Sequence, residues 1–284
     1  MTLTKSIAQF TIFAGMLCLV LMPRQILAND VSRSLQWALN TAPPFHIVAG
    51  PYRNQGICDS LMLAVESALP DYEAQRSLMP QTRIGMLFDR DVNQCFPCMI
   101  HRNNGPELRT VLSEPTHTYQ PHGIITRPEI ARQFRETYGE PVPLKALLAS
   151  NDFRLGQPAG RQYGTLQPIL DAYEGDDSYR VIRTGEHATT AILEMILAER
   201  IHYTIDYHSL LQYHRKNHQG DLEFLQLEEN QGLVVLGAIG CTNNDWGRGV
   251  IADINANIST IRQDPRFLQS LNLWVDNPAS LLDH

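Results

Sequence analysis

Short apolar segments typical of β-strands alternate with amphipathic helical segments along most of the chain, and this alternation constrains the fold more than any other feature. A strand pattern at residues 35–39 is followed by a helical pattern in which Leu61, Val65 and Leu69 recur at fourfold spacing. A strand pattern at 203–207 likewise precedes a polar helical pattern at 209–218. Such alternation predicts an α/β protein with largely parallel sheets.

The same patterns predict the remaining elements. Further strands are expected at residues 72–78, 93–100, 153–157, 180–183 and 232–241. Further helices are expected at residues 80–89, 128–139, 141–150, 165–173, 187–200, 244–262 and 265–275.

The length and charge of the chain narrow its organisation and its partners. With 284 residues, 43% of them hydrophobic, the chain exceeds the usual size of one domain and predicts two lobes. No Pro/Gly/Ser-rich linker, internal repeat or low-complexity segment divides it, so strands that cross between the lobes should join them. The net charge of −7, without a long run of like charges, argues against nucleic acid as a partner.

Residues 1–28 have the pattern of a secretory signal peptide. Lys5 supplies the positive start, an apolar block covers 7–22, and the segment ends at Ala28. Ile26 is bulkier than the small residue preferred three positions before the cut, so an uncleaved anchor or a shifted cleavage site stays open as an alternative. The sequence therefore predicts an exported protein.

The chain has five cysteines, and Cys18 lies within the predicted signal. The other four are an even number in an exported chain, which favours disulfides, and four cysteines allow three pairings. If the segment around Cys95 and Cys98 is an extended strand, their Cα atoms lie roughly 10 Å apart and their side chains point to opposite faces. That distance exceeds the roughly 7 Å limit for a bridge, so the two cysteines should have different partners.

The C-F-P-C spacing of Cys95 and Cys98 leaves two alternatives open. As a thiol–disulfide motif it would need its first cysteine at a helix N-terminus, whereas M-I-H-R-N-N-G-P follows. As a zinc site it would combine both cysteines with His101, His117 and His122. Ten histidines are scattered through the chain, which makes coincidental spacing the better explanation, and no cofactor is expected.

A set of segments in a fixed order carries a family resemblance. In chain order they are W-A-L-N-T-A-P-P-F, G-I-C-D-S-L-M-L-A-V, C-F-P-C, S-E-P-T-H-T-Y, P-A-G-R-Q-Y-G, L-A-E-R-I-H-Y-T-I-D-Y and C-T-N-N-D-W-G-R-G. Over nearly the whole chain after the signal, this resembles the family 3 extracellular solute-binding proteins, type II periplasmic binding proteins that feed amino-acid ABC transporters. More closely it resembles a branch of that superfamily without an assigned ligand.

The resemblance implies a two-lobed α/β fold in which two crossover strands act as a hinge and a polar ligand lies between the lobes. Lobe one would comprise residues 29–121 and 238–284, and lobe two residues 122–237, with crossovers at 122–126 and 233–238. It also implies a periplasmic monomer whose partner is an ABC transporter permease or a membrane sensor.

Two disulfides follow from this mapping. Cys241 would lie on the strand that returns to lobe one, where it could neighbour Cys95. That pairing is the first expectation, and Cys58 with Cys98 is the remaining pair.

The resemblance also points to an arginine in lobe one. Relatives hold the ligand carboxylate with an arginine shortly before an F-S-x-P turn, because a guanidinium can meet a carboxylate with two parallel hydrogen bonds. Here the turn is L-S-E-P, and counting back seven residues from Ser113 reaches Pro106. Arg102 and Arg109 flank that position, so the anchor is displaced or absent, and a solvated surface role is the alternative for each.

Lobe two would contribute a glycine-bracketed turn, P-A-G-R-Q-Y-G, whose backbone N–H groups could bind an anion. Arg161, Tyr163 and Gly164 are expected to face the cleft, unless this is a plain strand-to-helix turn. Asp206 lies close to the position where relatives bind the ligand amine, and a helix cap is its alternative.

Phe45, Tyr119 and Tyr207 are candidates for apolar or stacking walls of the cleft, with core packing as the alternative. The function predicted is capture of a small polar ligand, an amino acid or related carboxylate, without chemistry. An enzyme on the same scaffold, such as a periplasmic dehydratase, is the alternative, although no compact acid/base pair or nucleophile motif stands out.

Overall fold

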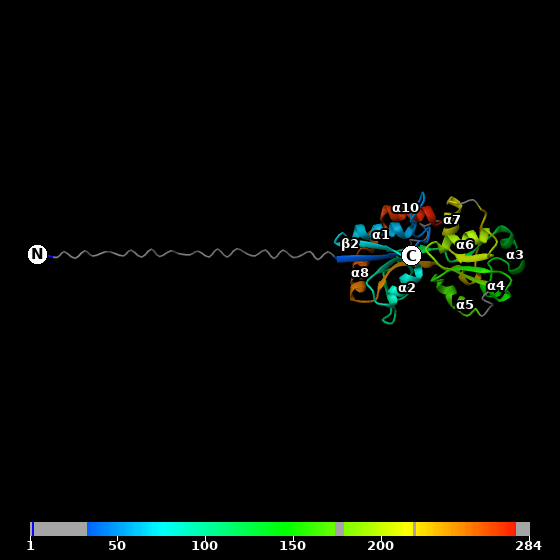
Figure 1. The fold of residues 1–284 in the computed structure, drawn as a ribbon, viewed down its shortest axis with the longest axis horizontal. Coiled ribbons are helices and arrows are strands. Elements are labelled where there is room, and N and C mark those ends of the chain that lie inside the picture. The colour runs from blue at the N-terminus through cyan, green and yellow to red at the C-terminus, as the bar shows by residue number, and fades with distance from the viewer. Residues whose placement is uncertain (1, 3–32, 174–178, 218–219, 277–284) are drawn as a thin grey trace. The chain divides into compact units, whose positions relative to one another are not determined.

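Two mixed β-sheets flanked by helices organise the part of the chain that the structure describes (Figure 1). The structure is a computed structural model that describes residues 33–173, 179–217 and 220–276, together with Thr2. Ser32–His284 is one compact unit. The predicted signal peptide at 1–28, including Cys18, lies outside the described residues apart from Thr2.

The first sheet has the strand order β2-β1-β3-β11-β4, and β5 also pairs with β11. Its strands are β1 (Arg33–Leu39), β2 (Tyr72–Leu78), β3 (Cys95–Ile100), β4 (Thr110–Leu112), β5 (His117–Tyr119) and β11 (Val235–Thr242). β1 pairs in parallel with β2 and β3, whereas β11 is antiparallel to β3, β4 and β5.

The second sheet has the order β10-β6-β9-β7-β8. Its strands are β6 (Gly123–Thr126), β7 (Leu155–Pro158), β8 (Arg180–Arg183), β9 (Tyr203–Asp206) and β10 (Glu223–Leu225). β7 is parallel to β8 and β9, and β6 is antiparallel to β9 and β10. The prediction of largely parallel sheets is therefore wrong for β6 and β11, because these strands carry the chain between the sheets and run against their neighbours.

Helices connect the strands and cover the sheets. The first sheet is accompanied by α1 (Ile57–Ala68), α2 (Gln81–Asp89), α8 (Asp245–Ala256), α9 (Ile258–Arg262) and α10 (Pro265–Trp274). The second is accompanied by α3 (Pro128–Tyr138), α4 (Leu144–Ser150), the 3-10 turn η1 (Gly164–Leu166), α5 (Gln167–Asp171), α6 (Ala188–Leu197), α7 (His208–Asn217) and the 3-10 turn η3 (Glu228–Asn230).

The single helix predicted at 244–262 is two helices, because the chain bends at Asn257. This residue ends α8 and precedes α9, and its side-chain Nδ2 donates to the Asp253 carbonyl at 2.9 Å. Ile254, Ile258 and Ile261 are nevertheless all buried in one core cluster. The apolar spacing alone therefore could not reveal the break.

The core of the first lobe brings together the two ends of the described chain. α1 packs on α10, and in Figure 1 the blue and cyan segments lie beside the orange and red ones. Trp37 on β1 and Trp274 on α10 are fully buried in this core with Leu61 and Val65 of α1. Residues from both ends of the sequence thus build one lobe.

Strand β6 of the second sheet is buried on both faces. Ile124 and Ile125 are neighbours on β6, and successive side chains on a strand point to opposite faces. Ile124 belongs to the cluster that includes residues of α3, α4 and α5, and Ile125 to the cluster that includes residues of α6 and α7. Both side chains are fully buried, which accounts for the apolar character of this strand.

The chain passes between the sheets twice. It leaves the first sheet after Tyr119 at the end of β5 and enters the second at Gly123, and it returns between β10 and β11. The two connections touch, because Asn230 Nδ2 donates to the His122 carbonyl at 2.8 Å. This agrees with a two-lobed fold whose halves are joined by crossing strands.

Both predicted disulfides are present: Cys95–Cys241 and Cys58–Cys98, with Cα separations of 4.0 and 5.8 Å. Cys95 and Cys241 are direct partners across β3 and β11, and Cys98 ties β3 to α1. The alternative of a thiol or zinc motif at Cys95 and Cys98 is wrong, because both sulfurs are bonded to other cysteines.

Within the described residues, no helix is both long and apolar enough to cross a membrane.

Candidate functional site

A cleft of about 1070 Å³ lies where the strands of both sheets end. Its lining follows the carboxyl ends of β1, β2 and β3 in the first sheet and of β7, β8 and β9 in the second. Ligands of α/β proteins bind outside the carboxyl ends of parallel strands, because the chain leaves the sheet there in loops that carry polar groups. The cleft is therefore the candidate binding site.

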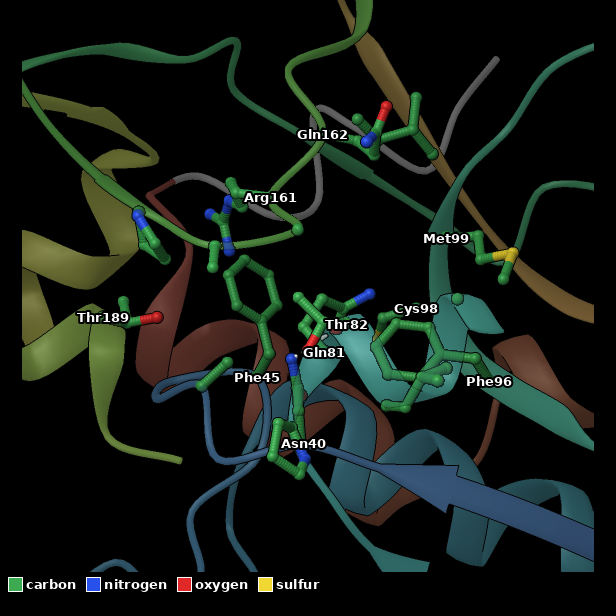
Figure 2. A pocket seen from close by; sticks show the side chains of 18 of the residues that line it. Asn40, Phe45, Gln81, Thr82, Phe96, Cys98, Met99, Arg161, Gln162 and Thr189 are labelled. Atoms are coloured by element: carbon green, nitrogen blue, oxygen red, sulfur yellow. Dashed lines mark hydrogen bonds between the residues drawn. The ribbon is translucent and has the colours of Figure 1, made fainter. Parts of the chain in front are cut away.

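The first lobe places a polar edge on the cleft just after β1. Asn40 and Thr41 follow the last residue of this strand, and Gln81 and Thr82 open α2. Asn40 Nδ2 donates to Gln81 Oε1 at 2.7 Å, which joins the two segments (Figure 2). The remaining buried oxygen of Asn40 and the Thr41 hydroxyl have no hydrogen-bond partner among the described residues.

Phe45 is held in place by the start of α1. Its carbonyl accepts the Cys58 N–H at 2.9 Å. The carboxylate of Asp59 accepts the Ile47 N–H at 2.9 Å and faces His46 Nδ1 at 2.9 Å. These bonds fix the loop that follows the two prolines, so the Phe45 ring has a defined direction into the cleft.

The first lobe also gives the cleft an apolar wall. Phe96, Met99 and Ile100 of β3 line it together with Ile84 and Phe88 of α2. Phe96, Ile84 and Phe88 are buried in one small core cluster. The wall is thus a continuation of the core and offers a ligand apolar contact.

Arg102 and Arg109 both line the cleft from the loop after β3, and both are exposed. Arg102 donates to the Thr110 hydroxyl at 2.5 Å, and partial burial lowers the pKa of its guanidinium. Asn104 fixes the loop by exchanging two hydrogen bonds with the backbone of Leu112. The loop that the sequence suggested thus lies on the cleft, and neither guanidinium forms an ion pair with a carboxylate among the described residues.

The second lobe approaches the first through the predicted turn after β7. Gly160 has a positive φ of 76°, and a Cβ there would lie 3.3 Å from atoms of Gln81 and Thr82. Glycine is suited to both the left-handed conformation and the close approach. Residues of this turn and Thr165 line the cleft opposite α2.

Arg161 forms a buried ion pair with Asp206. Its Nη2 donates a hydrogen bond to Asp206 Oδ1, which also accepts the Tyr207 N–H at 2.8 Å. The guanidinium carbon lies 5.4 Å from the centre of the Tyr207 ring and 5.9 Å from the centre of the Phe45 ring. Figure 2 shows the side chains of Arg161 and Phe45 next to each other in the pocket. The side chains are 15% and 1% exposed, so the pair is largely removed from water.

The protonation tendencies of this pair follow from burial and mutual charge. Burial raises the pKa of the Asp206 carboxyl, and the charge of Arg161 and the Tyr207 N–H oppose that change. Burial opposes the charge of Arg161, but the combined effect of Asp206 and the neighbouring tyrosines leaves its pKa raised. Arg161 is therefore a permanent cation at this place.

A row of aromatic rings runs from the cleft into the crossover. Tyr207 stacks on His122 at 3.9 Å between ring centres and lies 5.1 Å from Tyr119, which meets His117 edge-on at 4.4 Å. All four are buried. Burial holds the pKa of His117 at about 3 and that of His122 well below its usual value, so both imidazoles are neutral.

The structure brings together most of the predicted site residues. Those that line the cleft are Phe45, Arg102, Arg109, Tyr119, Arg161, Gly164 and Tyr207. Asp206 does not line it and sits behind Arg161, while Tyr163 points into the core of the second lobe. The turn thus presents Arg161 and Gly164 to the cleft and buries Tyr163.

Several cleft residues were not singled out from the sequence. They are Asn40, Gln81, Thr82, Gln162, Thr165, Thr184 and Thr189. Their common signal is position, since each follows the end of a strand or lies near the start of a helix. In the described part of the chain, no group of three or more His, Cys, Asp or Glu side chains could hold a metal ion.

Comparison with known structures identifies the fold. A periplasmic binding protein of Salmonella typhimurium with high arginine specificity superposes with a TM-score of 0.58 at 15% identity, over 86% of this chain and 100% of that one. The solute receptors for L-cysteine of Neisseria gonorrhoeae give 0.61 at 14% identity, over 88% and 96%.

A substrate-binding protein of an ABC uptake transporter from Streptococcus pneumoniae, with bound histidine, gives a TM-score of 0.62 at 12% identity, over 86% of this chain and 93% of that one. No protein-family model matches the chain, and no curated protein sequence does. The predicted resemblance is confirmed at the level of the fold, which is that of two-lobed periplasmic binding proteins for amino acids.

Proposed function

We propose that this chain is an exported solute-binding protein that captures a small polar ligand between its lobes, without chemistry. The observation that carries the proposal is the cleft of about 1070 Å³, lined from both sheets by polar side chains at the carboxyl ends of strands. An amino acid or a related carboxylate is the ligand class proposed, because Arg102 and Arg109 lie on this cleft with exposed side chains.

Hinged closure is the proposed mode of capture. The lobes would be residues 29–121 with 238–284 and residues 122–237. The two chain connections would bend, and the wall carrying Gln81 and Thr82, which already lies close to the turn at Gly160, would move away from it to admit a ligand and return on binding. A ligand that contacts both walls favours the closed arrangement, since it gains contacts only there.

Periplasmic location and the partner are part of the same proposal. The signal-like segment at 1–28 would direct export. The closed protein would then be recognised by an ABC transporter permease or a membrane sensor. Recovery of a monomer from the periplasmic fraction, with an N-terminus near residue 29, is the expected result of cell fractionation and N-terminal sequencing.

A thermal-shift panel tests capture itself. The purified protein, starting at residue 29, is heated with amino acids, amines, short peptides and organic acids, each at matched ionic strength. A ligand that binds only the folded state raises the apparent melting temperature in a concentration-dependent way. Stabilisation by at least one small polar compound is expected, and a panel without any stabilising compound counts against ligand capture.

A further inference from the structure

Arg161 is held in the way that a protein holds a free cationic ligand. The Asp206 carboxylate accepts a hydrogen bond from its guanidinium. The guanidinium carbon lies 5.4 Å from the centre of the Tyr207 ring and 5.9 Å from the centre of the Phe45 ring. A buried carboxylate with aromatic faces is a recognition set for guanidinium and ammonium groups. Tyr207 and Asp206 belong to the second lobe, whereas Phe45 belongs to the first.

We propose that Arg161 is a built-in occupant of the cation site of the cleft. The carboxylate and ring faces that could bind a ligand cation are used by the chain itself. The cleft would then take small carboxylates and would not require an amino group on them. The assignment of Arg161 rests on its own contacts, while the ligand class also rests on the proposed function.

The state of Asp206 supports this assignment. Its Oδ1 already accepts from Arg161 and from the Tyr207 N–H, and its side chain is only 1% exposed. A ligand ammonium could reach it only by displacing the guanidinium, which would leave a second buried cation without a partner. An unpaired buried charge is strongly unfavourable, so exchange is opposed.

The other charged side chains that line the cleft also favour an anionic ligand. Among the described residues that line it, the acidic ones are Asp89 and Glu186, and both are exposed. Arg102 and Arg109 add two guanidinium groups on the first lobe. The lining therefore offers an anion several donors and offers a ligand amine no buried carboxylate.

Chemical rescue tests the occupancy directly. In R161A the deleted side chain leaves a space beside Asp206, Phe45 and Tyr207 that methylguanidinium should fill. The melting temperature of R161A should rise with methylguanidinium concentration, whereas wild type should not respond. N-methylurea, the neutral compound of similar shape, is the ligand control, and R161A/D206N is the protein control in which the rescue should disappear.

If R161A is recovered unfolded, the yield of folded protein on refolding becomes the readout, and methylguanidinium but not N-methylurea should raise it. The proposal is overturned if methylguanidinium has no effect beyond N-methylurea in both formats. It is equally overturned if R161A/D206N responds as strongly as R161A. The rescue experiment uses no natural ligand, so it gives a result even if the thermal-shift panel finds no ligand.

Matched ligand pairs test the consequence for specificity in the wild-type protein. Glutarate and L-glutamate differ only in the amino group, as do 3-phenylpropionate and L-phenylalanine. Whichever skeleton binds, the member without the amino group is expected to stabilise the protein at least as much. Stabilisation by the amino acid and not by its deaminated partner overturns the inferred ligand class.

Discussion

Cys95 and Cys241 face each other on β3 and β11, with Cα atoms 4.0 Å apart and a disulfide between them. The bond closes a chain separation of 146 residues that includes the whole second sheet. It therefore secures the strand by which the chain returns to the first lobe. Cys58–Cys98 closes a separation of only 40 residues and fastens α1 to β3.

Removing either disulfide should destabilise the protein. The loss should be larger for Cys95–Cys241, because it closes the longer loop of chain. The unfolded chain regains loop entropy, which predicts a loss in unfolding free energy of about 5 kcal/mol for C95A/C241A and about 4 kcal/mol for C58A/C98A. Urea unfolding of both double variants, beside the oxidised wild type, measures the difference. Variants as stable as the wild type would show that these bridges do not constrain the unfolded chain.

Asp59 should be required to position Phe45. Its carboxylate accepts the Ile47 and Gly56 N–H groups at 2.9 and 3.1 Å and faces His46 Nδ1. D59A leaves these buried donors without an acceptor and should cost about 3 kcal/mol or more, with a smaller loss for D59N. Urea unfolding measures the stability, and the exposed D71N is the control.

The same Asp59 variants should lower the affinity of the cleft for any ligand that it binds, because Phe45 loses its fixed direction. Titration calorimetry of folded D59N against wild type measures this effect. Unchanged stability in D59A, or unchanged affinity in D59N, contradicts the positioning role.

Two glycines of one helix should respond oppositely to alanine. A Cβ on Gly247 would lie 1.9 Å from the Thr242 carbonyl oxygen, whereas a Cβ on Gly249 meets nothing within 4 Å. G247A should cost roughly 1–3 kcal/mol because backbone must shift. G249A should gain about 0.5–1 kcal/mol from helix propensity. Chemical denaturation compares them, and equal effects of the two substitutions would refute the packing around Gly247.

Acidification should destabilise the protein below about pH 6.5 through His117 and His122. Burial lowers both pKa values, that of His117 to about 3, so the unfolded chain binds protons that the folded state does not. More protons on the unfolded state mean that stability falls as the pH falls. His117 should contribute a loss of about 2 kcal/mol in the free energy of unfolding between pH 6.5 and pH 5, and His122 should add a loss of the same sign.

Urea unfolding between pH 5 and 7.5 measures that slope. H117Q and H122Q should each flatten this slope, because each removes one buried neutral imidazole. A wild-type stability that stays constant over this range, or slopes that both variants leave unaltered, would contradict the burial of neutral imidazoles.

Local patterns were enough to predict much of the fold. β2 and β8 were predicted with their observed bounds, because short runs between turn residues define them. The extended geometry of C-F-P-C separated Cys95 from Cys98, and the family mapping supplied their partners. The crossing strands followed from the absence of a linker. The antiparallel direction of β6 and β11 was not predicted, because the direction of a strand within a sheet depends on where the chain re-enters that sheet.

The site was harder to predict because it depends on contacts between distant residues. Arg161 and Asp206 were each identified as candidates, but 45 positions separate them, and no local pattern shows that they pair. Arg161, Tyr163 and Gly164 were all expected in the cleft, but the turn, which has left-handed glycines at 160 and 164, brings Arg161 and Gly164 there and buries Tyr163. Asn40 lies in one of the family segments and Thr82 in a predicted helix, but neither was expected in the cleft, because only the folded chain brings the end of β1 and the start of α2 together there.

If the cleft binds a small polar ligand, two matched tryptophan substitutions, one in the cleft and one outside it, should differ in their effect on binding. Thr82 on α2 lines the cleft and Thr260 on α9 does not, and both are exposed positions on helices. Titration calorimetry with the best compound of the panel should give the same affinity for wild type and T260W and no measurable binding for T82W. Unaltered binding by T82W would place the ligand elsewhere and contradict the account.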